Sequence, residues 1–258
     1  MSNKKKTLST LFQACKNEGI FVFDNDRVKE ICQQTGFKNP FDLTKIDNSD
    51  LLPDDMQREG YCVVHLGNGR HCFMPIANTW YHEFEKITED EKVEWIYTPS
   101  ILNHTDTSES NVISFVNNQK IIYDFLYGRK DISPKMYLPR RSKITTSYLV
   151  GNQKIVVKRL QMEMDAIFEL DGKIVAVEAK NGFPRDFAVY QLFHPFLDYH
   201  QKSVEGIIKG VSEIMGCYLL RDREQHSIRL YLYTFPRPHD MMSIRLVKKA
   251  EYVLKGEK

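Results

Sequence analysis

The segment 163–182 contains the strongest structural constraint in the chain, a two-residue turn between two strand-like runs. Asp171 and Gly172 form a dipeptide that favours a tight β-hairpin turn. Apolar residues, many of them β-branched, flank this dipeptide on both sides, as in buried strands. The sequence therefore predicts an antiparallel hairpin in which Ile167 lies opposite Ala176.

The same register brings four charged residues to one face of the hairpin. Asp165 falls opposite Glu178 and Glu163 falls opposite Lys180, and the alternation of strand side chains puts all four on one side. Opposed residues have Cβ atoms about 5 Å apart, so the two carboxylates repel unless a cation lies between them. An exposed edge hairpin with cross-strand ion pairs is the alternative. Apolar residues on both faces of 174–180 favour a covered strand, where unpaired charges are costly.

The expected cation is Mg²⁺, which Mn²⁺ could replace, because the inferred donors are hard oxygens without His or Cys. Such an ion keeps several waters, takes phosphate oxygens as ligands and lowers the pKa of bound water. Lys180 could orient or deprotonate the attacking water, and we expect burial and the cation to lower its pKa for that task. Glu163 is either a further acid of the site or the ion-pair partner of Lys180. This chemistry is typical of phosphodiester hydrolysis.

The order of elements around the hairpin predicts an α/β fold with a mixed β-sheet flanked by helices. One amphipathic helix should begin at a cap at Thr107 or Ser108 and end at Gly128. A second helix, over 186–200, contains Pro195, which should kink or divide it. Strands are expected over 153–170, 173–180, 213–220 and 227–235.

Residues 1–100 are predicted to form an N-terminal DNA-recognition or accessory domain, and residues 101–258 the second domain. Helices are expected over 8–18 and 26–35, followed by a hairpin around the turn 67–69. Helices followed by a hairpin resemble a winged-helix arrangement, although a packing appendage is the alternative. Cys62 and the nearby His65 do not predict zinc, since residues three apart on a strand point to opposite faces.

Asp165, a turn, and a strand ending in Glu178-Ala179-Lys180 resemble the PD-(D/E)XK nuclease signature. The helix before the hairpin and the helix after it give a layout similar to type II restriction endonucleases. The resemblance covers roughly residues 105–235, and Met164 stands where the motif's name has proline. It implies that residues 101–258 form a PD-(D/E)XK-type nuclease domain with a restriction-endonuclease-like core, and that the protein is a site-specific double-stranded DNA endonuclease.

The resemblance also implies roles for individual residues. Asp165 and Glu178 would bind the metal together with the carbonyl oxygen of Ala179, and Lys180 would activate water. Glu109, at the start of the preceding helix, matches the acid that often joins the site, although it also suits the helix macrodipole.

A basic block in 129–159 contains nine Lys or Arg residues against Asp131 as its single acid. It is either a phosphate-contacting surface or a solvated basic loop. Asn181, Arg185 and Gln191 follow the signature and could also contact DNA, although a surface glutamine is the plainer reading of Gln191. The candidate DNA-binding residues are Arg140, Arg141, Lys143, Asn181, Arg185 and Gln191.

The expected partners are double-stranded DNA, a second copy in a homodimer, and a cognate DNA methyltransferase in the same system. The chain has no signal-peptide pattern and no apolar run long enough for a bilayer, so we expect a cytoplasmic protein without a membrane partner. Its five scattered cysteines suit reduced thiols. The alternatives are a structure-selective repair or recombination nuclease and a non-catalytic DNA-binding regulator.

Overall fold

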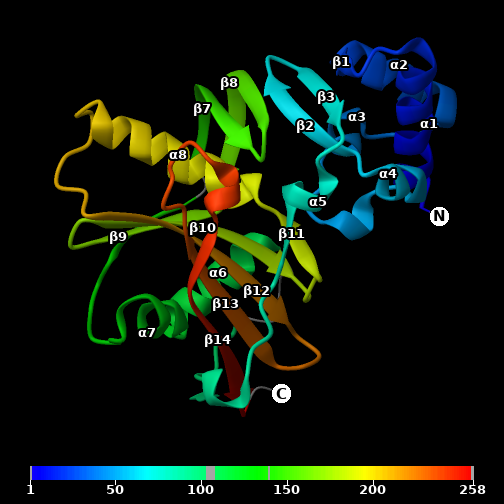
Figure 1. Cartoon of the computed structure of the whole chain (residues 1–258). Helices are drawn as coiled ribbons and strands as arrows, with labels where there is room; N and C mark the ends of the chain where they lie inside the picture. Colours follow the sequence, from blue (N-terminus) through cyan, green and yellow to red (C-terminus); the bar gives the residue numbers. More distant parts are fainter. Residues whose placement is uncertain (1, 103–107, 139, 257–258) are drawn as a thin grey trace.

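The computed structural model describes residues 2–102, 108–138 and 140–256, and its largest element is a seven-stranded mixed sheet (Figure 1). Two neighbouring strand pairs in this sheet are parallel, β10 with β12 and β5 with β14, and the other four pairs are antiparallel. From edge to edge the strands are β5 (Lys92–Ile96), β14 (Arg245–Lys255), β13 (Ser227–Thr234), β12 (Glu213–Asp222), β10 (Lys173–Asn181), β9 (Ala166–Leu170) and β6 (Lys135–Tyr137).

Helices cover both faces of the sheet, which confirms the expected α/β class (Figure 1). α6 (Glu109–Asn118) and α7 (Ile121–Tyr127) pack on one face, and α8 (Tyr190–Val204) packs on the other. Alternation along β10 divides its side chains between these layers. Val177 joins the core beneath α6 and α7, whereas Glu178 contacts α8.

The turn after β9 has the backbone that the sequence predicts. Asp171 and Gly172 have φ of 50° and 78°, the positive values that a tight hairpin turn requires. Ile167 pairs with Ala176, as expected, and the β9–β10 ladder ends with the next pair outward.

At Asp165 the chain changes partners, which the sequence did not predict. The expected strand over 153–170 is interrupted there, because β8 (Gln153–Met164) pairs with β7 (Arg140–Val150) in a separate two-stranded sheet. We call this sheet the β7–β8 ribbon. The basic block is therefore largely strand and not a loop, although the side chain of Arg140 lies outside the described residues.

The two helices predicted before and after the β9–β10 hairpin differ from expectation. The helix expected up to Gly128 is broken at Lys120, whose φ is 57°. The preceding Gln119 is buried, and its side-chain amide bonds to both backbone polar groups of Thr98, at 2.9 and 2.8 Å, which fixes the end of α6. Pro195 does not divide α8, which continues through it.

Residues 2–74 form an N-terminal unit with a three-stranded antiparallel sheet and short helices (Figure 1). The helices expected over 8–18 and 26–35 and the hairpin around 67–69 are all present. In sheet order the strands are β1 (Val22–Asp24), β3 (Arg70–Met74) and β2 (Cys62–Gly67). The helices are α1 (Asn3–Glu18), α2 (Asn25–Thr35), α3 (Pro40–Leu43) and α4 (Asp54–Glu59), with a 3₁₀ turn η1 (Ser49–Leu51).

The N-terminal unit packs directly on the ribbon. Gly67 has φ of +85°, and a Cβ at this position would lie 2.0 Å from the carbonyl oxygen of Lys158. The following residues join the unit to the large sheet, and β5, assigned by the sequence to the N-terminal domain, is an edge strand of that sheet. The joining elements are α5 (Ala77–Trp80), β4 (Tyr81–Glu83) paired with β11 (Asp186–Ala188), and η2 (Glu89–Glu91); η3 (Met241–Ser243) precedes β14.

All five cysteines are free, as their odd number suggested. Among the helices that the structure describes, none is both long enough and apolar enough to span a bilayer.

Candidate active site

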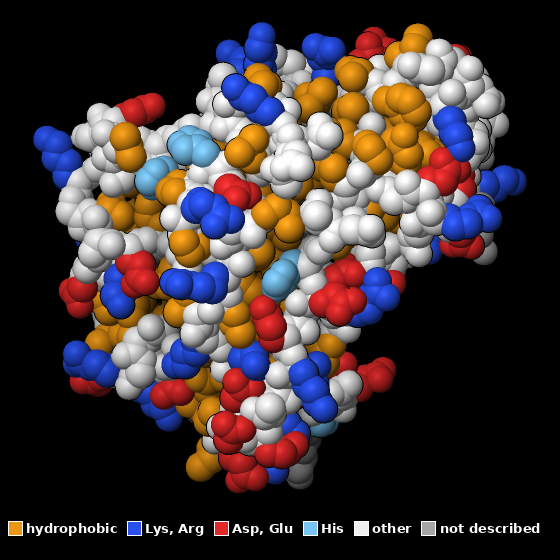
Figure 2. Space-filling view, viewed as in Figure 1, with side chains coloured by type: hydrophobic (Ala, Val, Ile, Leu, Met, Phe, Trp, Pro, Cys, Tyr) orange, Lys and Arg blue, Asp and Glu red, His pale blue; other side chains and the backbone are white. Residues whose placement is uncertain are grey.

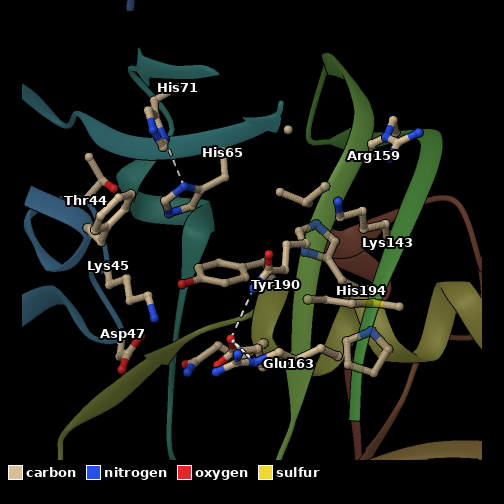
Figure 3. Close-up of a pocket in the computed structure, with 18 of the residues that line it drawn as sticks. Thr44, Lys45, Asp47, His65, His71, Lys143, Arg159, Glu163, Tyr190 and His194 are labelled. Atoms are coloured by element: carbon tan, nitrogen blue, oxygen red, sulfur yellow. Dashed lines mark hydrogen bonds and ion pairs between the residues drawn. The ribbon is translucent and has the colours of Figure 1, made fainter. Parts of the chain in front are cut away.

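A cavity of about 700 Å³ lies between the N-terminal unit, the β7–β8 ribbon and the first turns of α8. In Figure 3, His65 projects from the N-terminal wall, Arg159 from the ribbon wall, and Tyr190 between them. The four residues that the resemblance assigns to catalysis all line this cavity: Asp165, Glu178, Lys180 and Glu109.

Two carboxylates each present one uncommitted oxygen. Asp165 Oδ2 accepts a hydrogen bond from the backbone N–H of Ala179 at 2.9 Å, which ties the bend before β9 to β10. Glu178 Oε1 accepts from the side-chain amide of Gln191 at 2.7 Å. Among the described residues, the hydrogen bonds of these two carboxylates go to Oδ2 of Asp165 and Oε1 of Glu178, and none reaches Oδ1 of Asp165 or Oε2 of Glu178. Both oxygens are therefore available to a ligand.

The Lys180 ammonium lies among three acids from three parts of the chain. Its Nζ is 2.9 Å from Glu178 Oε1 on the same strand and 2.7 Å from Glu109 Oε1 on α6. Asp47 Oδ2, from the segment between α3 and η1, lies 3.6 Å away. The Lys180 side chain is only 18% exposed, so these contacts are only partly screened by water.

Burial changes the acid–base properties of this group. It raises the pKa of Asp165 and raises the pKa of Glu178 to about 8, although the Lys180 ammonium opposes both changes. Burial alone would lower the pKa of Lys180, but the carboxylates of Glu178, Asp47 and Glu109 together raise it. The carboxylates thus outweigh burial, contrary to the expectation that burial lowers the pKa of Lys180. Ionising both Asp165 and Glu178 is costly until a further cation arrives.

The position of Glu178 depends on a close helix–strand contact. Tyr218 on β12 donates its hydroxyl to Gln191 Oε1 at 3.1 Å, so the Gln191 amide group points its nitrogen at Glu178. α8 can approach β12 because Gly216 has no side chain: a Cβ there would lie 2.9 Å from Leu192 Cβ. Gln191 therefore acts inside the site and is not the surface residue that the plainer reading of the sequence suggested.

The donor set suits a magnesium ion held by few protein ligands. Mg²⁺ commonly binds one or two carboxylates and completes its shell with water and phosphate oxygens. Asp165 and Glu178 supply two hard oxygens, each without a partner, in a setting where a cation would favour ionisation. Within the described ranges, no group of three or more His, Cys, Asp or Glu residues is arranged to hold a metal. One reason is that Lys180 occupies the space between Glu178, Glu109 and Asp47.

The expected pairing of Glu163 with Lys180 is wrong. Because β8 leaves the β9–β10 hairpin, Glu163 lies opposite Arg141 on β7, and the two form an ion pair at 2.9 Å. Arg141 and Lys143 line the cavity. The side chain of Arg140 lies outside the described residues.

Two other candidate DNA-binding residues do not line the cavity. Arg185 bonds Ser49 at 2.8 Å and Asp186 at 3.2 Å, which anchors the η1 turn to β11. Asn181, the last residue of β10, is exposed. Of the described candidates, Arg141, Lys143 and Gln191 therefore line the cavity, whereas Asn181 and Arg185 do not.

Sequence reasoning missed Asp47 and Arg159. Asp47 lies in a turn-rich segment, 62 positions before Glu109, with no local pattern that distinguishes it from its neighbours. Its backbone carbonyl accepts from Ala188 N–H at 2.7 Å, which fixes it beside Lys180 of β10 only in the folded protein. Arg159 had a weak signal, since Lys158-Arg159 places two polar residues in succession in an otherwise alternating strand.

His65 and His71 at the cavity wall form a polar cluster with Asn25. His65 and His71 bond through their Nδ1 atoms at 3.0 Å, and His71 Nε2 bonds Asn25 at 2.9 Å. Burial lowers the pKa of His65 to about 4 and that of His71 to about 3. Both rings are therefore neutral near pH 7.

Two family models together match nearly the whole chain. Residues 76–253 match the family described as Domain of unknown function (DUF6997), and residues 5–73 match the family described as Domain of unknown function (DUF6996). The first match covers more than half of the chain, so the chain belongs to the DUF6997 family. No curated protein and no solved structure matches it.

Proposed function

We propose that this member of the DUF6997 family is a Mg²⁺-dependent endonuclease that hydrolyses phosphodiester bonds in double-stranded DNA. The observation that carries the proposal is the pair of carboxylates, Asp165 and Glu178, that each offer an uncommitted oxygen beside the Lys180 ammonium. The acids, the lysine and the cavity support this proposal, which rests on the resemblance to the PD-(D/E)XK signature.

The metal ligands in this proposal are Asp165 and Glu178, with the carbonyl oxygen of Ala179 as a further donor. When bound, Mg²⁺ supplies Lewis-acid stabilisation of phosphate and lowers the pKa of a bound water. Gln191 holds Glu178 in position through the 2.7 Å hydrogen bond.

Lys180 acts in this proposal as a cation and not as a base. The surrounding carboxylates raise its pKa, so Nζ keeps its protons and can donate hydrogen bonds to the scissile phosphate. Charge accumulates on that phosphate in the transition state, and a pre-positioned ammonium stabilises it. Glu109 and Asp47 hold the ammonium at the site.

The charge distribution of the chain supports a DNA partner. Lys143, Arg141 and Arg159 line the cavity on the ribbon side, and Arg70 lines it on the side of the N-terminal unit. In Figure 2, acidic side chains gather instead at the lower end of the molecule, where Figure 1 shows η2 and the C-terminus. A polyanion would therefore approach through the cavity end.

The finer proposal is a type II restriction enzyme. In this proposal the restriction-endonuclease-like core cuts DNA, and the N-terminal unit, whose helices and hairpin follow the order of a winged helix, helps to hold the duplex. We expect a homodimer acting on a symmetric site, a cytoplasmic location and a cognate methyltransferase that protects host DNA.

The test is digestion of plasmid and phage DNA with Mg²⁺, with Mn²⁺ as a substitute. We expect discrete bands from the wild-type protein, and a loss of at least 100-fold in rate for Asp165→Ala and Lys180→Ala with DNA binding retained. Glu213→Gln is the matched control, since this partly exposed acid on β12 pairs with Lys173 outside the cavity. A smear would contradict sequence specificity, and intact DNA would contradict the nuclease.

A further inference from the structure

We propose that the β7–β8 ribbon reads the sequence of the bound duplex from its major groove, with Arg159 contacting a base edge. The inference rests on the nuclease function proposed above and names the element that selects its substrate. A two-stranded antiparallel ribbon has the width to enter the major groove of B-DNA, where each base pair presents a distinct pattern of donors and acceptors.

The ribbon has one buried face and one polar face. Along β8 the burial alternates from residue to residue, so apolar side chains anchor the ribbon to the core and polar ones point outward. The anchors include Ile144 and Tyr148 on β7 and Val157, Leu160 and Met162 on β8. The outward-facing residues that line the cavity are Arg141, Lys143, Arg159, Gln161 and Glu163.

A bulge sets Arg159 apart from the other ribbon residues. Ile144 pairs with Leu160 and Thr146 pairs with Val157, so two residues of β8 stand opposite Thr145. Arg159 has φ of +51°, and its N–H donates to Thr145 Oγ1 at 2.9 Å instead of to a strand carbonyl. A left-handed backbone at a non-glycine residue costs on the order of 1–3 kcal/mol and occurs often at binding sites.

No contact of the Arg159 side chain with the described part of the chain accounts for this left-handed backbone. Its guanidinium makes no hydrogen bond or ion pair with the described residues, and it projects from the ribbon beside Lys143 (Figure 3). Arg141, by contrast, is already paired with Glu163. Arg159 therefore offers a complete set of donors to a ligand, and a guanidinium suits the O6 and N7 acceptors of guanine.

The ribbon also fixes how far the read base lies from the cut. β8 leads directly into Asp165, and Arg159 precedes that acid by six residues. At about 3.3 Å per residue the two Cα atoms are at most roughly 20 Å apart. With about 3.4 Å per base pair, the base contacted by Arg159 lies within about six base pairs of the scissile phosphate. Gln161, four residues from Asp165, reads closer to the cut.

The experiment selects duplexes that bind from a randomised pool in the presence of Ca²⁺. Three proteins are compared: Asp165→Asn alone, Asp165→Asn with Arg159→Gly, and Asp165→Asn with Lys154→Ala. Glycine tolerates the left-handed backbone, so Arg159→Gly removes the side chain without destabilising the ribbon. Lys154 is exposed on the same ribbon outside the cavity and serves as the control. Wild-type cleavage of plasmid DNA is measured in parallel.

We expect the selected consensus to contain a G·C pair within about six positions of the cut, and Arg159→Gly to lower the preference at that pair by roughly 5- to 150-fold. Lys154→Ala should keep the consensus. An unchanged consensus in Arg159→Gly, or equal binding of all duplexes, would overturn the inference while wild-type cleavage still supports the nuclease. A consensus lost in Arg159→Gly without any wild-type cleavage would support the reader and contradict the nuclease.

Discussion

Glu178 is an acid at a buried position where ionisation is unfavourable. The cost of ionising it should be measurable as a pH dependence of the protein's thermal stability. Its pKa is about 8 in the folded chain against an ordinary value of 4.5. Between these values the folded state binds a proton that the unfolded state does not, so the acid destabilises the fold increasingly as pH rises. Glu178→Gln removes this effect. We expect its melting temperature relative to wild type to rise from about pH 4.5 to 8 and then to level off, in buffer with a chelator.

Glu213→Gln should show no such trend, because that acid, on the same sheet, is partly exposed and pairs with Lys173. Added Mg²⁺ should stabilise the wild-type protein and not Glu178→Gln, since the metal binds the ionised acid. If the difference in melting temperature between Glu178→Gln and wild type does not change with pH, burial does not raise the pKa of Glu178.

At the scale of elements, the contact between the N-terminal hairpin and the ribbon depends on one missing side chain. Gly67→Ala would place a Cβ 2.0 Å from a backbone carbonyl, so β2 and β8 must separate. Gly60, at the end of α4, has a similar positive φ of +73° with nothing within 4 Å of the added Cβ. Gly60→Ala should cost about 1–2 kcal/mol, and Gly67→Ala more than about 3 kcal/mol, in denaturant unfolding. Equal losses of unfolding free energy in the two variants would contradict a close contact between Gly67 and the Lys158 carbonyl.

The elements also show what the sequence could predict. The hairpin at Asp171-Gly172 obeys a local rule, so its register, and with it Glu178 and Lys180 on one face, could be derived from spacing. The departure of β8 from the hairpin at Asp165 could not be derived in this way. The alternation of buried and exposed side chains along β8 is equally compatible with pairing to β7 or to β10. Glu163 was misplaced for this reason.

At the scale of the whole molecule, the N-terminal unit contributes directly to the site through Asp47. The spacing of residues gave no sign of this, because the contact with Lys180 forms only when the unit packs on β11. Asp47→Asn keeps the shape but removes the charge. We expect the cleavage rate constant to fall roughly 10-fold with little change in DNA affinity, as for a residue that positions a catalytic group. Asp50→Asn, three residues away and exposed, should match wild type in single-turnover cleavage.

A loss of DNA affinity without a loss of rate in Asp47→Asn would contradict a positioning role. The same result would place Asp47 among the groups that govern access of the polyanion to the cavity.

The wide sequence separation of the contacts at Lys180 has a consequence for biosynthesis. Glu109 lies 71 residues before the lysine, and Tyr218, which orients Gln191, lies after it. A chain still emerging from the ribosome lacks β12 until residue 222 has been added, and β13 and β14 follow later still. The acids therefore meet the ammonium in their final arrangement only after β12, which carries Tyr218, has been synthesised.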